Sequence, residues 1–515
     1  MALKSKHPSI SGLESISPPR KLFRFAWQEL AWHFLPPLVY FVIMLGFSPY
    51  WDMFWIYSDE GFEVMKALLV SRGFSLFSQV WSDQPPLHTE LLALIFRING
   101  PGVFAARLLT LCFTCLLIWA LVQMVRLAWS NWAALAAAVF LLLLPAFPSL
   151  SVAALTGQPA LALACVSLLG LFYWHRRPSW FVLVFSGSLM GLSLLTKAFT
   201  GILIPIFGGV FLFVEHRTQP HPRNLWRTLW PALVWGSSIL LSALGLSLLL
   251  VGPENLWQLI QPHVAAARST AYPSNEQLYS IWFYLRDAWT ILLLAIAGIG
   301  IAFSQRRMWM AYPAVWMLAA MAVLSIYRPI WSHHQLLVTI PAAMLAGGAA
   351  AEGVRWLAGQ LKGGSILHRE SILYGSTLVL ALITLAVRWP DVVSQFEVPG
   401  DMSAEPRSAY EDRVMRRINE YAPQTRWMVT DLPMYAFRAG LLTPPNLAVI
   451  SWKRLAARDL TEAEILETIQ ELEPEQILFG RFRFDQVEDY IQEDYFPVLE
   501  REDQLKLYIR KDLLK

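Results

Sequence analysis

The chain has 515 residues, of which 56% are hydrophobic and 15% are charged, and its formal net charge is +3. A soluble protein of this size carries about 25% charged residues. The composition therefore excludes an ordinary soluble enzyme and predicts a polytopic membrane protein. The small net charge and the absence of a long basic run exclude a nucleic-acid-binding protein.

Residues 1–29 form a basic N-terminal segment, which we expect on the cytoplasmic side. Apolar runs of spanning length then recur as far as residue 390 and predict a helical membrane domain over residues 30–390. The predicted spans are 30–49, 104–125, 133–150, 160–174, 180–196, 200–214, 229–250, 288–303, 310–326, 335–354 and 371–389.

Residues 50–103 form a long first outer loop, in which two interfacial helices are predicted at 60–72 and 87–99. The segment 85–100 is the ambiguous one, because every later loop would change sides if it spanned the membrane. When it lies flat, most loop Lys and Arg residues fall on the side of the basic N-terminus, as the positive-inside rule requires. This arrangement places the C-terminal domain outside the cytoplasm.

Two charged motifs in the outer loops suggest chemistry. Asp59 and Glu60 open an amphipathic segment next to the bilayer, an unusual place for two adjacent acids, although such an acid also serves as a helix cap or a solvated surface group. Lys197 lies between apolar stretches in "GLSLLTKAFTG". A lysine in that position either extends to the interface or binds a phosphate group.

Other polar groups of the outer loops are candidate ligands of a head group or a sugar. These candidates are Asp83, Gln158, His263, Arg268, Arg328 and His334. The spacing of Asp59, Glu60, Asp83 and His263 or His334 permits a divalent metal and does not require one. The adjacent His333 and His334 point about 100° apart on a helix and form no obvious metal pair. The sequence contains no Walker A loop and no dinucleotide-binding fingerprint, which argues against a soluble nucleotide donor.

Residues 391–515 differ in composition, since they hold 24 of the 38 acidic residues against 16 Lys or Arg. We predict a separate water-soluble α/β domain here. Asp431 follows a predicted strand and is interpreted as a turn residue or a site residue. The expected helices are 407–422, 461–472 and 485–491, and the expected strands are 426–430, 446–450, 475–480 and 504–510.

The order of these motifs resembles a known family. An acidic pair after the first span is followed by "WSDQPPLHTELL", "GPGVFAARLL", "GLSLLTKAFTG" and a histidine-bearing segment before a late span. Over roughly residues 30–345 this pattern resembles the polytopic glycosyltransferases of the protein O-mannosyltransferase and aminoarabinose-transferase type, which share the GT-C fold.

The resemblance implies a sugar donor linked to a polyprenyl phosphate, in a bacterial inner membrane. It implies that Asp59 is the catalytic base with Glu60 in support, and that Lys197 lies near the leaving phosphate. It matches Asp83 to the acid before the double proline and gives Arg107 a structural role. Two residues depart from the pattern, because Gln158 replaces an acid of many relatives and Gln84 replaces the lysine of the aminoarabinose branch.

These expectations predict a hexosyl or pentosyl transferase that acts on a hydroxyl of a lipid, glycan or protein at the periplasmic face, with inversion. Lys197, together with Arg328 or Arg268, is expected to hold the donor phosphate, and Asp83, Gln158, His263 and His334 to contact substrate. We expect no obligatory metal cofactor. A lipid or polysaccharide transporter (flippase) and a lipid-linked polysaccharide ligase remain as alternatives.

Overall fold

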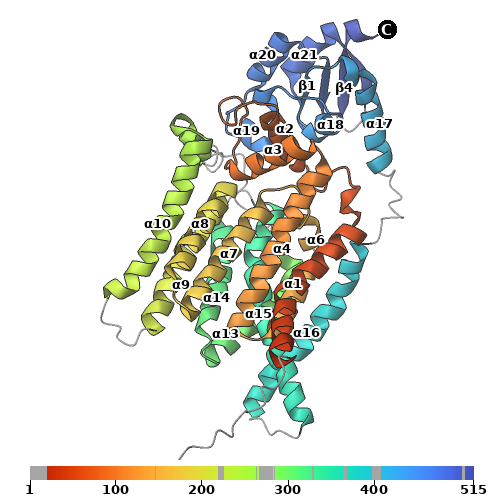
Figure 1. The fold of residues 1–515 in the computed structure, drawn as a ribbon. Coiled ribbons are helices and arrows are strands. Elements are labelled where there is room, and N and C mark those ends of the chain that lie inside the picture. The colour runs from red at the N-terminus through yellow and green to blue at the C-terminus, as the bar shows by residue number, and fades with distance from the viewer. Residues whose placement is uncertain are drawn as a thin grey trace, which may run out of the picture.

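A computed structural model describes residues 20–144, 146–218, 225–261, 264–265, 282, 285–327, 330–362, 368–396, 407–500 and 505–514. A bundle of long helices forms one end of the molecule, and a small α/β domain lies at the other end (Figure 1). Helices α2 and α3 of the first outer loop lie between the bundle and this domain. The site described below is at that junction.

The membrane domain contains eight helices that are long and apolar enough to cross a bilayer, among the described residues. Three shorter apolar helices, Ala31–Phe47, Asn131–Leu142 and Trp180–Thr196, accompany them. Each of the eleven predicted spans overlaps one of these helices. The helices are α1 (Arg20–Phe47), α4 (Val103–Ala128), α5 (Asn131–Leu142), α7 (Gly157–Arg176), α8 (Trp180–Thr196), η2 (Ala198–Ile202) continued by α9 (Leu203–Thr218), α10 (Leu225–Leu250), α13 (Trp289–Ser304), α14 (Ala311–Ile326), α15 (Leu336–Leu361) and α16 (His368–Ser394).

One predicted span, 133–150, is longer than the helix that forms. Helix α5 ends at Leu142, and a separate four-residue helix, α6 (Phe147–Leu150), begins with Pro148 in its first turn. Proline is tolerated in the first turn of a helix but not in its interior. The apolar run therefore divides into two elements.

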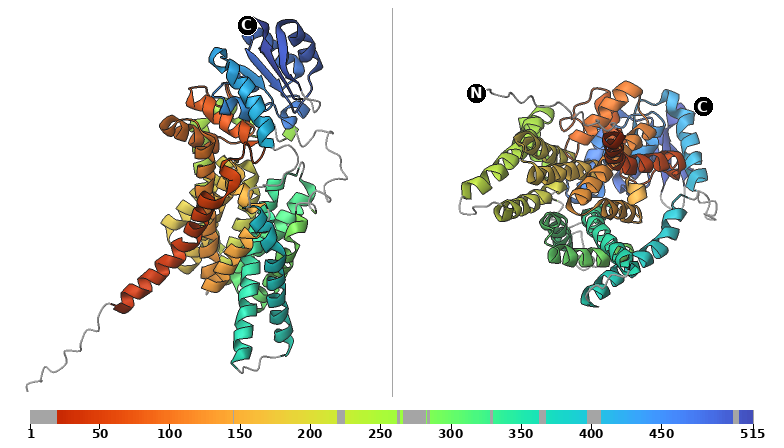
Figure 2. Two further views of the ribbon diagram at one scale, coloured as in Figure 1. Left: turned by 90° about the vertical axis from the view of Figure 1, so that its right-hand side faces the viewer. Right: turned by 60° about the horizontal axis from the view of Figure 1, so that its bottom comes forward.

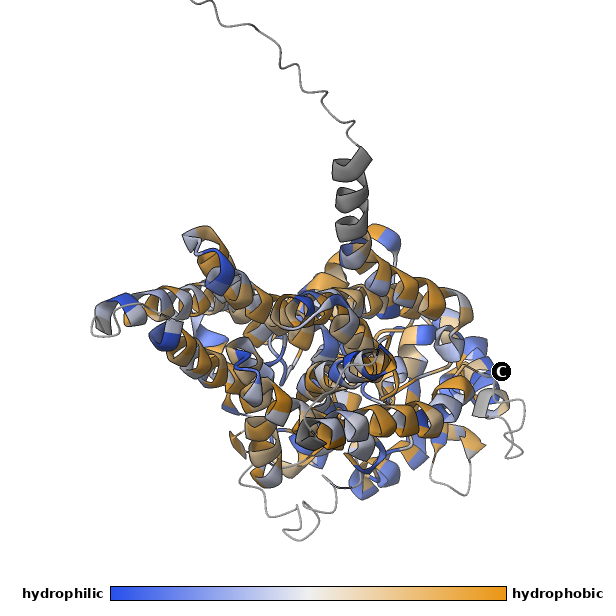
Figure 3. Ribbon diagram, turned by 90° about the horizontal axis from the view of Figure 1, so that it is seen from below, coloured by the Kyte–Doolittle hydropathy of each residue, from blue (hydrophilic) through white to orange (hydrophobic). Residues whose placement is uncertain are grey.

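Helix α15 is the central helix of the bundle, since nearly all of its residues up to Gly353 are buried. Small residues allow neighbouring backbones to approach it closely. A Cβ atom on Gly347 would lie 2.5 Å from the backbone nitrogen of Ala137 on α5. By contrast, large apolar side chains such as Phe181 and Phe303 are exposed on the outer faces of the bundle, and hydrophobic residues follow its helices in the view from below (Figure 3). This distribution suits a bundle surrounded by lipid.

The two predicted interfacial helices form as α2 (Glu60–Ser71) and α3 (Leu87–Asn99). Helix α18 (Pro433–Arg438) of the C-terminal domain packs on α2. The contact depends on Gly61, because a Cβ atom there would lie 2.7 Å from the backbone nitrogen of Met434. Figure 2 shows α1 leaving the bundle at a tilt, with its first turns at the end opposite the C-terminal domain.

The C-terminal domain is built on a four-stranded sheet in the order β1-β2-β4-β3. Strand β1 (Met428–Thr430) pairs parallel to β2 (Gln476–Phe479), while β4 (Lys506–Arg510) pairs antiparallel to β2 and to β3 (Tyr495–Glu500). Helices α17 (Arg407–Tyr421), α20 (Glu462–Leu472) and α21 (Asp485–Asp494) match the three predicted helices. The domain also contains α19 (Trp452–Ala456).

Two strand predictions for this domain differ from the structure. The predicted strand 446–450 is wrong, because its first two residues belong to a 3-10 turn (Pro445–Leu447) and residues 448–450 belong to no strand. Strand β3 was not predicted. It is an edge strand with Pro497 at a register shift, a position where proline is tolerated and where the strand pattern is weak.

Candidate active site

A cavity of about 800 Å³ lies where the first outer loop, the ends of several bundle helices and the C-terminal domain meet. Its walls combine charged side chains with the apolar side chains of Phe199, Val323, Ile326 and Trp331. Asp59 and Lys197 both line it. The acidic pair and the lysine were predicted to share one cavity. Asp59 and Lys197 do so, whereas Glu60 does not line the cavity.

Asp59 directly precedes α2, and its side chain makes no capping hydrogen bond to that helix. The carboxylate opens into the cavity, with 55% of the side chain accessible. Withdrawal from bulk water raises the pKa of Asp59, and the nearby Arg481 opposes this effect. An uncapped carboxylate that faces a cavity and is more basic than usual is suited to accept a proton.

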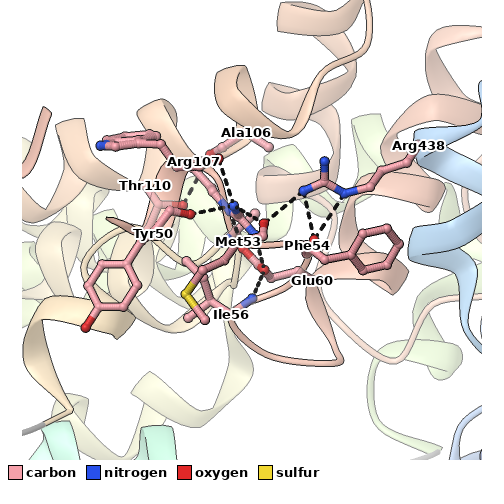
Figure 4. A network of polar contacts seen from close by, with 11 residues as sticks. Tyr50, Met53, Phe54, Ile56, Glu60, Ala106, Arg107, Thr110 and Arg438 are labelled. Atoms are coloured by element: carbon pink, nitrogen blue, oxygen red, sulfur yellow. Dashed lines mark hydrogen bonds and ion pairs between the residues drawn. The ribbon is translucent and has the colours of Figure 1, made fainter. Parts of the chain in front are cut away.

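Glu60 has a different environment from its neighbour, since it is fully buried and does not line the cavity. Arg107 donates to its two carboxylate oxygens from Nε at 3.1 Å and Nη2 at 2.9 Å. The backbone N–H groups of Ile56 and Ala154 complete its partners at 2.7 and 2.9 Å. Figure 4 shows this network of polar contacts. Glu60 thus ties the loop before Asp59 to α4, which is a supporting role.

Arg107 reinforces the same tie by donating to the carbonyl groups of Tyr50 at 2.6 Å and Met53 at 2.9 Å. Both partners belong to the loop that leads from α1 to Asp59. The structural role that the sequence suggested for Arg107 therefore acts directly on the segment that carries Asp59.

Lys197 joins α8 to η2 in an extended backbone conformation, and its side chain is directed into the cavity. Its ammonium nitrogen lies 5.9 Å from the centre of the Phe199 ring and 3.8 Å from the point that a Cβ atom of Gly157 would occupy. The ammonium group is therefore close to the N-terminus of α7, where backbone N–H groups and the helix dipole favour an anion. Burial lowers the pKa of Lys197 to about 8, although Glu63, Asp83 and Asp59 oppose this effect.

Asp83 also lines the cavity, as predicted for a substrate-contacting residue. Its Oδ2 atom accepts from Lys453 Nζ at 2.8 Å and from Gln84 Nε2 at 3.0 Å. Lys453 belongs to the C-terminal domain, so this ion pair joins that domain to the first outer loop.

A second cluster of charged residues is centred on Glu63, one turn after Asp59 on α2. Lys66 donates to Glu63 Oε1 at 3.0 Å and to Ser82 at 3.3 Å, and His88 Nδ1 lies 3.6 Å from Glu63 Oε2. Burial alone would raise the pKa of Glu63, but Lys66 and His88 hold it below its ordinary value. Glu63 therefore stays charged and paired, unlike Asp59.

His334 lines the cavity beside His333 and stacks on Phe199 with 4.9 Å between ring centres. Its Nδ1 atom accepts the backbone N–H of Trp331 at 3.1 Å, which fixes the orientation of the ring. Gln158 does not line the cavity. It is buried at the second position of α7, and its amide has no hydrogen-bond partner in the described part of the chain. Arg268, Arg328 and His263 lie outside the described residues.

Within the described ranges, no three His, Cys, Asp or Glu side chains are placed to hold a metal ion together. The carboxylates of the cavity instead face lysine and arginine side chains. The expectation that metal is not obligatory remains a prediction.

Sequence reasoning missed three cations of the cavity: Lys66 on α2, and Lys453 and Arg481, which come from the C-terminal domain. Asp431 fixes the position of Arg481. Its carboxylate accepts the backbone N–H groups of Gly480, Arg481 and Phe482 at 3.0, 2.8 and 2.8 Å. Asp431 therefore acts as a structural turn residue that shapes the loop carrying Arg481.

Comparison with known proteins agrees with this architecture. The family model described as dolichyl-phosphate-mannose-protein mannosyltransferase matches residues 83–244. No curated protein sequence matches the chain.

Several solved structures share the fold. ArnT from Cupriavidus metallidurans bound to undecaprenyl phosphate is 14% identical, with a TM-score of 0.63 over 97% of this chain and 100% of that chain. ArnT in the apo state is 13% identical, with a TM-score of 0.59 over 95% of this chain and 98% of that chain. The oligosaccharyltransferase AglB from Archaeoglobus fulgidus, in complex with an inhibitory peptide and a dolichol-phosphate, is 12% identical, with a TM-score of 0.52 over 88% and 70%.

The helical bundle, the α/β domain at one end and the similarity to these structures confirm the resemblance that the sequence motifs indicated. The chain is a multi-pass membrane protein with the GT-C fold.

Proposed function

We propose that this protein transfers a sugar from a polyprenyl-phosphate donor to a hydroxyl acceptor, with inversion of the anomeric centre. The observation that carries the proposal is that Asp59 and Lys197 line one cavity, so that a base and a phosphate ligand can act on one substrate. The reaction belongs to the periplasmic face of a bacterial inner membrane, because the positive-inside rule places the N-terminus in the cytoplasm.

The donor lipid fits the apolar side of the cavity. Ile326 and Trp331 line it and are also 77% and 47% exposed, so this wall continues to the outer surface of the bundle. A prenyl chain can lie along that surface while its phosphate reaches Lys197 and the N-terminus of α7. The undecaprenyl phosphate bound to the similar ArnT structure supports a donor of this class.

Asp59 then accepts the proton of the acceptor hydroxyl while the hydroxyl oxygen forms a bond to the anomeric carbon. The bond from that carbon to the phosphate oxygen breaks, and its electron pair leaves with the phosphate. Lys197 stabilises the charge on the departing group, which is where electrostatic catalysis is most effective. A single displacement of this kind inverts the anomeric centre, with one carboxylate acting as base.

The acceptor class is a hydroxyl of a lipid, a glycan or a protein. Asp83 and His334 line the cavity within the same space and are the residues we assign to substrate contact. Arg268 and Arg328 remain predicted ligands of the donor phosphate. His263 and Gln158 remain predicted substrate ligands, although Gln158 does not line the described cavity. The reaction as proposed uses no metal.

The test incubates the purified protein in lipid nanodiscs with radiolabelled undecaprenyl-phosphate mannose, glucose, galactose and aminoarabinose, with and without a bacterial membrane extract. A transferase releases undecaprenyl phosphate from one of these donors when the extract is present and labels an acceptor. A flippase moves a donor across a liposome without cleaving it, and a polysaccharide ligase leaves all four donors intact. Either of those results would overturn the proposal.

The orientation is tested separately. A cysteine introduced at exposed Arg483 should react with a membrane-impermeant maleimide in intact spheroplasts, whereas a cysteine at exposed Arg177, at the opposite end of α7 from Gly157, should react only after lysis. The reverse pattern would place the cavity on the cytoplasmic side.

A further inference from the structure

Arg481 reaches the cavity from the soluble domain, and the sheet explains how. Strands β1 and β2 are parallel neighbours, so their carboxyl ends meet at one edge. Asp431 follows β1 and Arg481 lies in the loop after β2. Because Asp431 is fully buried and accepts three consecutive backbone N–H groups of that loop, the loop has a defined shape.

The side chain of Arg481 also lies near two aromatic rings. Its guanidinium lies 5.3 Å from the ring centre of Phe62, on α2, and 5.9 Å from that of Phe482. Its Nη1 atom is 4.0 Å from Asp59 Oδ1. That nitrogen is buried and has no hydrogen-bond partner among the described residues. Arg481 is thus directed at Asp59 without forming a close ion pair that would occupy the carboxylate.

The other charges around Asp59 make this contact important. Desolvation in the cavity is the largest effect that disfavours ionisation of Asp59, and the negative charges of Asp83 and Glu63 add to it, whereas Arg481 and, more weakly, Lys197 favour ionisation. Lys66 is hydrogen-bonded to Glu63, and Lys453 is paired with Asp83. Arg481 is therefore the strongest of the favourable charges acting on Asp59.

The two domains are fixed to each other next to this pair. Arg438 on α18 donates to the carbonyl groups of Met53 and Phe54, in the loop before Asp59 (Figure 4). Gly61 allows α18 to approach α2 closely. Because these contacts lie on both sides of Asp59 in sequence, the docked domain holds Arg481 at a set position relative to the carboxylate.

We propose that Arg481 is a positioning residue of the transfer reaction, which orients the Asp59 carboxylate and offsets the negative charge of Asp83 and Glu63. The C-terminal domain thereby completes the active site. This inference rests on the proposed function, in which Asp59 is the base.

The experiment compares Arg481→Gln, Arg481→Lys and the control Arg483→Gln, which removes an exposed arginine two positions further along. Rates of undecaprenyl phosphate release are measured against pH, with the donor and extract that the wild-type protein uses. We expect Arg481→Gln to lower kcat about 10–100-fold with little change in the donor KM, and to move the acidic limb of the profile about one unit higher. Arg481→Lys should restore part of the lost kcat and part of the shift in the acidic limb. Arg483→Gln should match the wild type.

Two results would overturn the inference. One is an Arg481→Gln profile equal to that of Arg483→Gln. The other is a raised donor KM with an unchanged kcat and an unchanged acidic limb, which would make Arg481 a ligand of the donor phosphate. In both cases the wild-type protein still transfers sugar and the proposed function stands. If the wild-type protein releases no undecaprenyl phosphate from any donor, the proposed function itself fails.

Discussion

Asp59 and Lys197 line the same cavity, although Asp59 precedes α2 in the first outer loop and Lys197 joins α8 to η2. The structure brings them together because α7, α8 and α4 pack side by side and the loop that carries Asp59 is tied to α4 by the Glu60–Arg107 pair. A base and a cation then face one space from different elements. This arrangement separates proton transfer from phosphate binding and allows each to be tested alone.

Lys197→Gln should weaken binding of undecaprenyl phosphate about 10–100-fold, because a hydrogen bond to a charged group contributes about 1.5–3 kcal/mol. Binding is measured by the quenching of protein fluorescence in nanodiscs. Replacement of exposed Lys362, at the end of α15, by Gln is the control and should leave binding unchanged. Equal affinities for wild type and Lys197→Gln would remove Lys197 from the phosphate site.

The pH dependence of that binding follows from the pKa of Lys197, which burial lowers to about 8. The side chain is charged below this pH and loses its proton as the pH rises through it. Affinity for undecaprenyl phosphate should therefore decline above about pH 8 in the wild-type protein. The Lys197→Arg variant should keep its affinity to higher pH, since arginine stays protonated. The same decline in both proteins would argue against this explanation.

Glu60→Gln should destabilise the protein by about 3–5 kcal/mol, the usual cost of breaking one partner of a buried ion pair. Arg107 would keep its charge without a carboxylate in a fully buried position. Thermal unfolding in detergent, monitored by tryptophan fluorescence, measures the effect. Asp52→Asn, at an exposed acid of the same loop, should change the unfolding temperature little. Comparable stability of the two variants would contradict the structural role of Glu60.

Much of the fold could be predicted because its signals are local. The apolar runs located the helices of the bundle, and the pattern of 60–72 and 87–99 located α2 and α3 to within one residue. Local signals also explain the errors. The run 133–150 conceals the break between α5 and α6, and the proline in β3 weakened its strand pattern.

The site was less predictable, because tertiary contacts decide which polar side chains reach the cavity. Asp59 and Glu60 are adjacent in the sequence, yet one opens to the cavity and the other is buried against Arg107. Helix α2 begins at Glu60, directly after Asp59, so the two side chains point into different surroundings. Arg481 and Arg483 occupy similar polar positions in "GRFRF", and nothing local distinguishes the arginine that faces Asp59 from the one that faces solvent.

Gly61→Ala should disturb the docking of the C-terminal domain, since the added methyl group would lie 2.7 Å from the backbone nitrogen of Met434. We expect faster hydrogen exchange in α2 and α18, together with a loss of transfer similar to that of Arg481→Gln. Gly46→Ala is a matched control, because no atom lies within 4 Å of a Cβ at that position. Unchanged exchange in Gly61→Ala would show that the contact does not hold the domain.

Removal of divalent metal ions should leave the transfer rate unchanged, because Lys197, rather than a metal, receives the phosphate charge in the proposed reaction. Activity is measured after dialysis against EDTA and again after addition of Mg²⁺, Mn²⁺ or Zn²⁺. A loss on dialysis that one of these ions restores would require a metal site.

In the proposed reaction, Asp59 is the base and the leaving group is bound at Lys197. The most direct measurement is the rate of undecaprenyl phosphate release by Asp59→Asn, with its affinity for undecaprenyl phosphate measured in parallel. We expect the rate to fall about 10²–10⁴-fold while the affinity remains within a few-fold of the wild type. Full activity in a correctly folded Asp59→Asn protein would contradict the account.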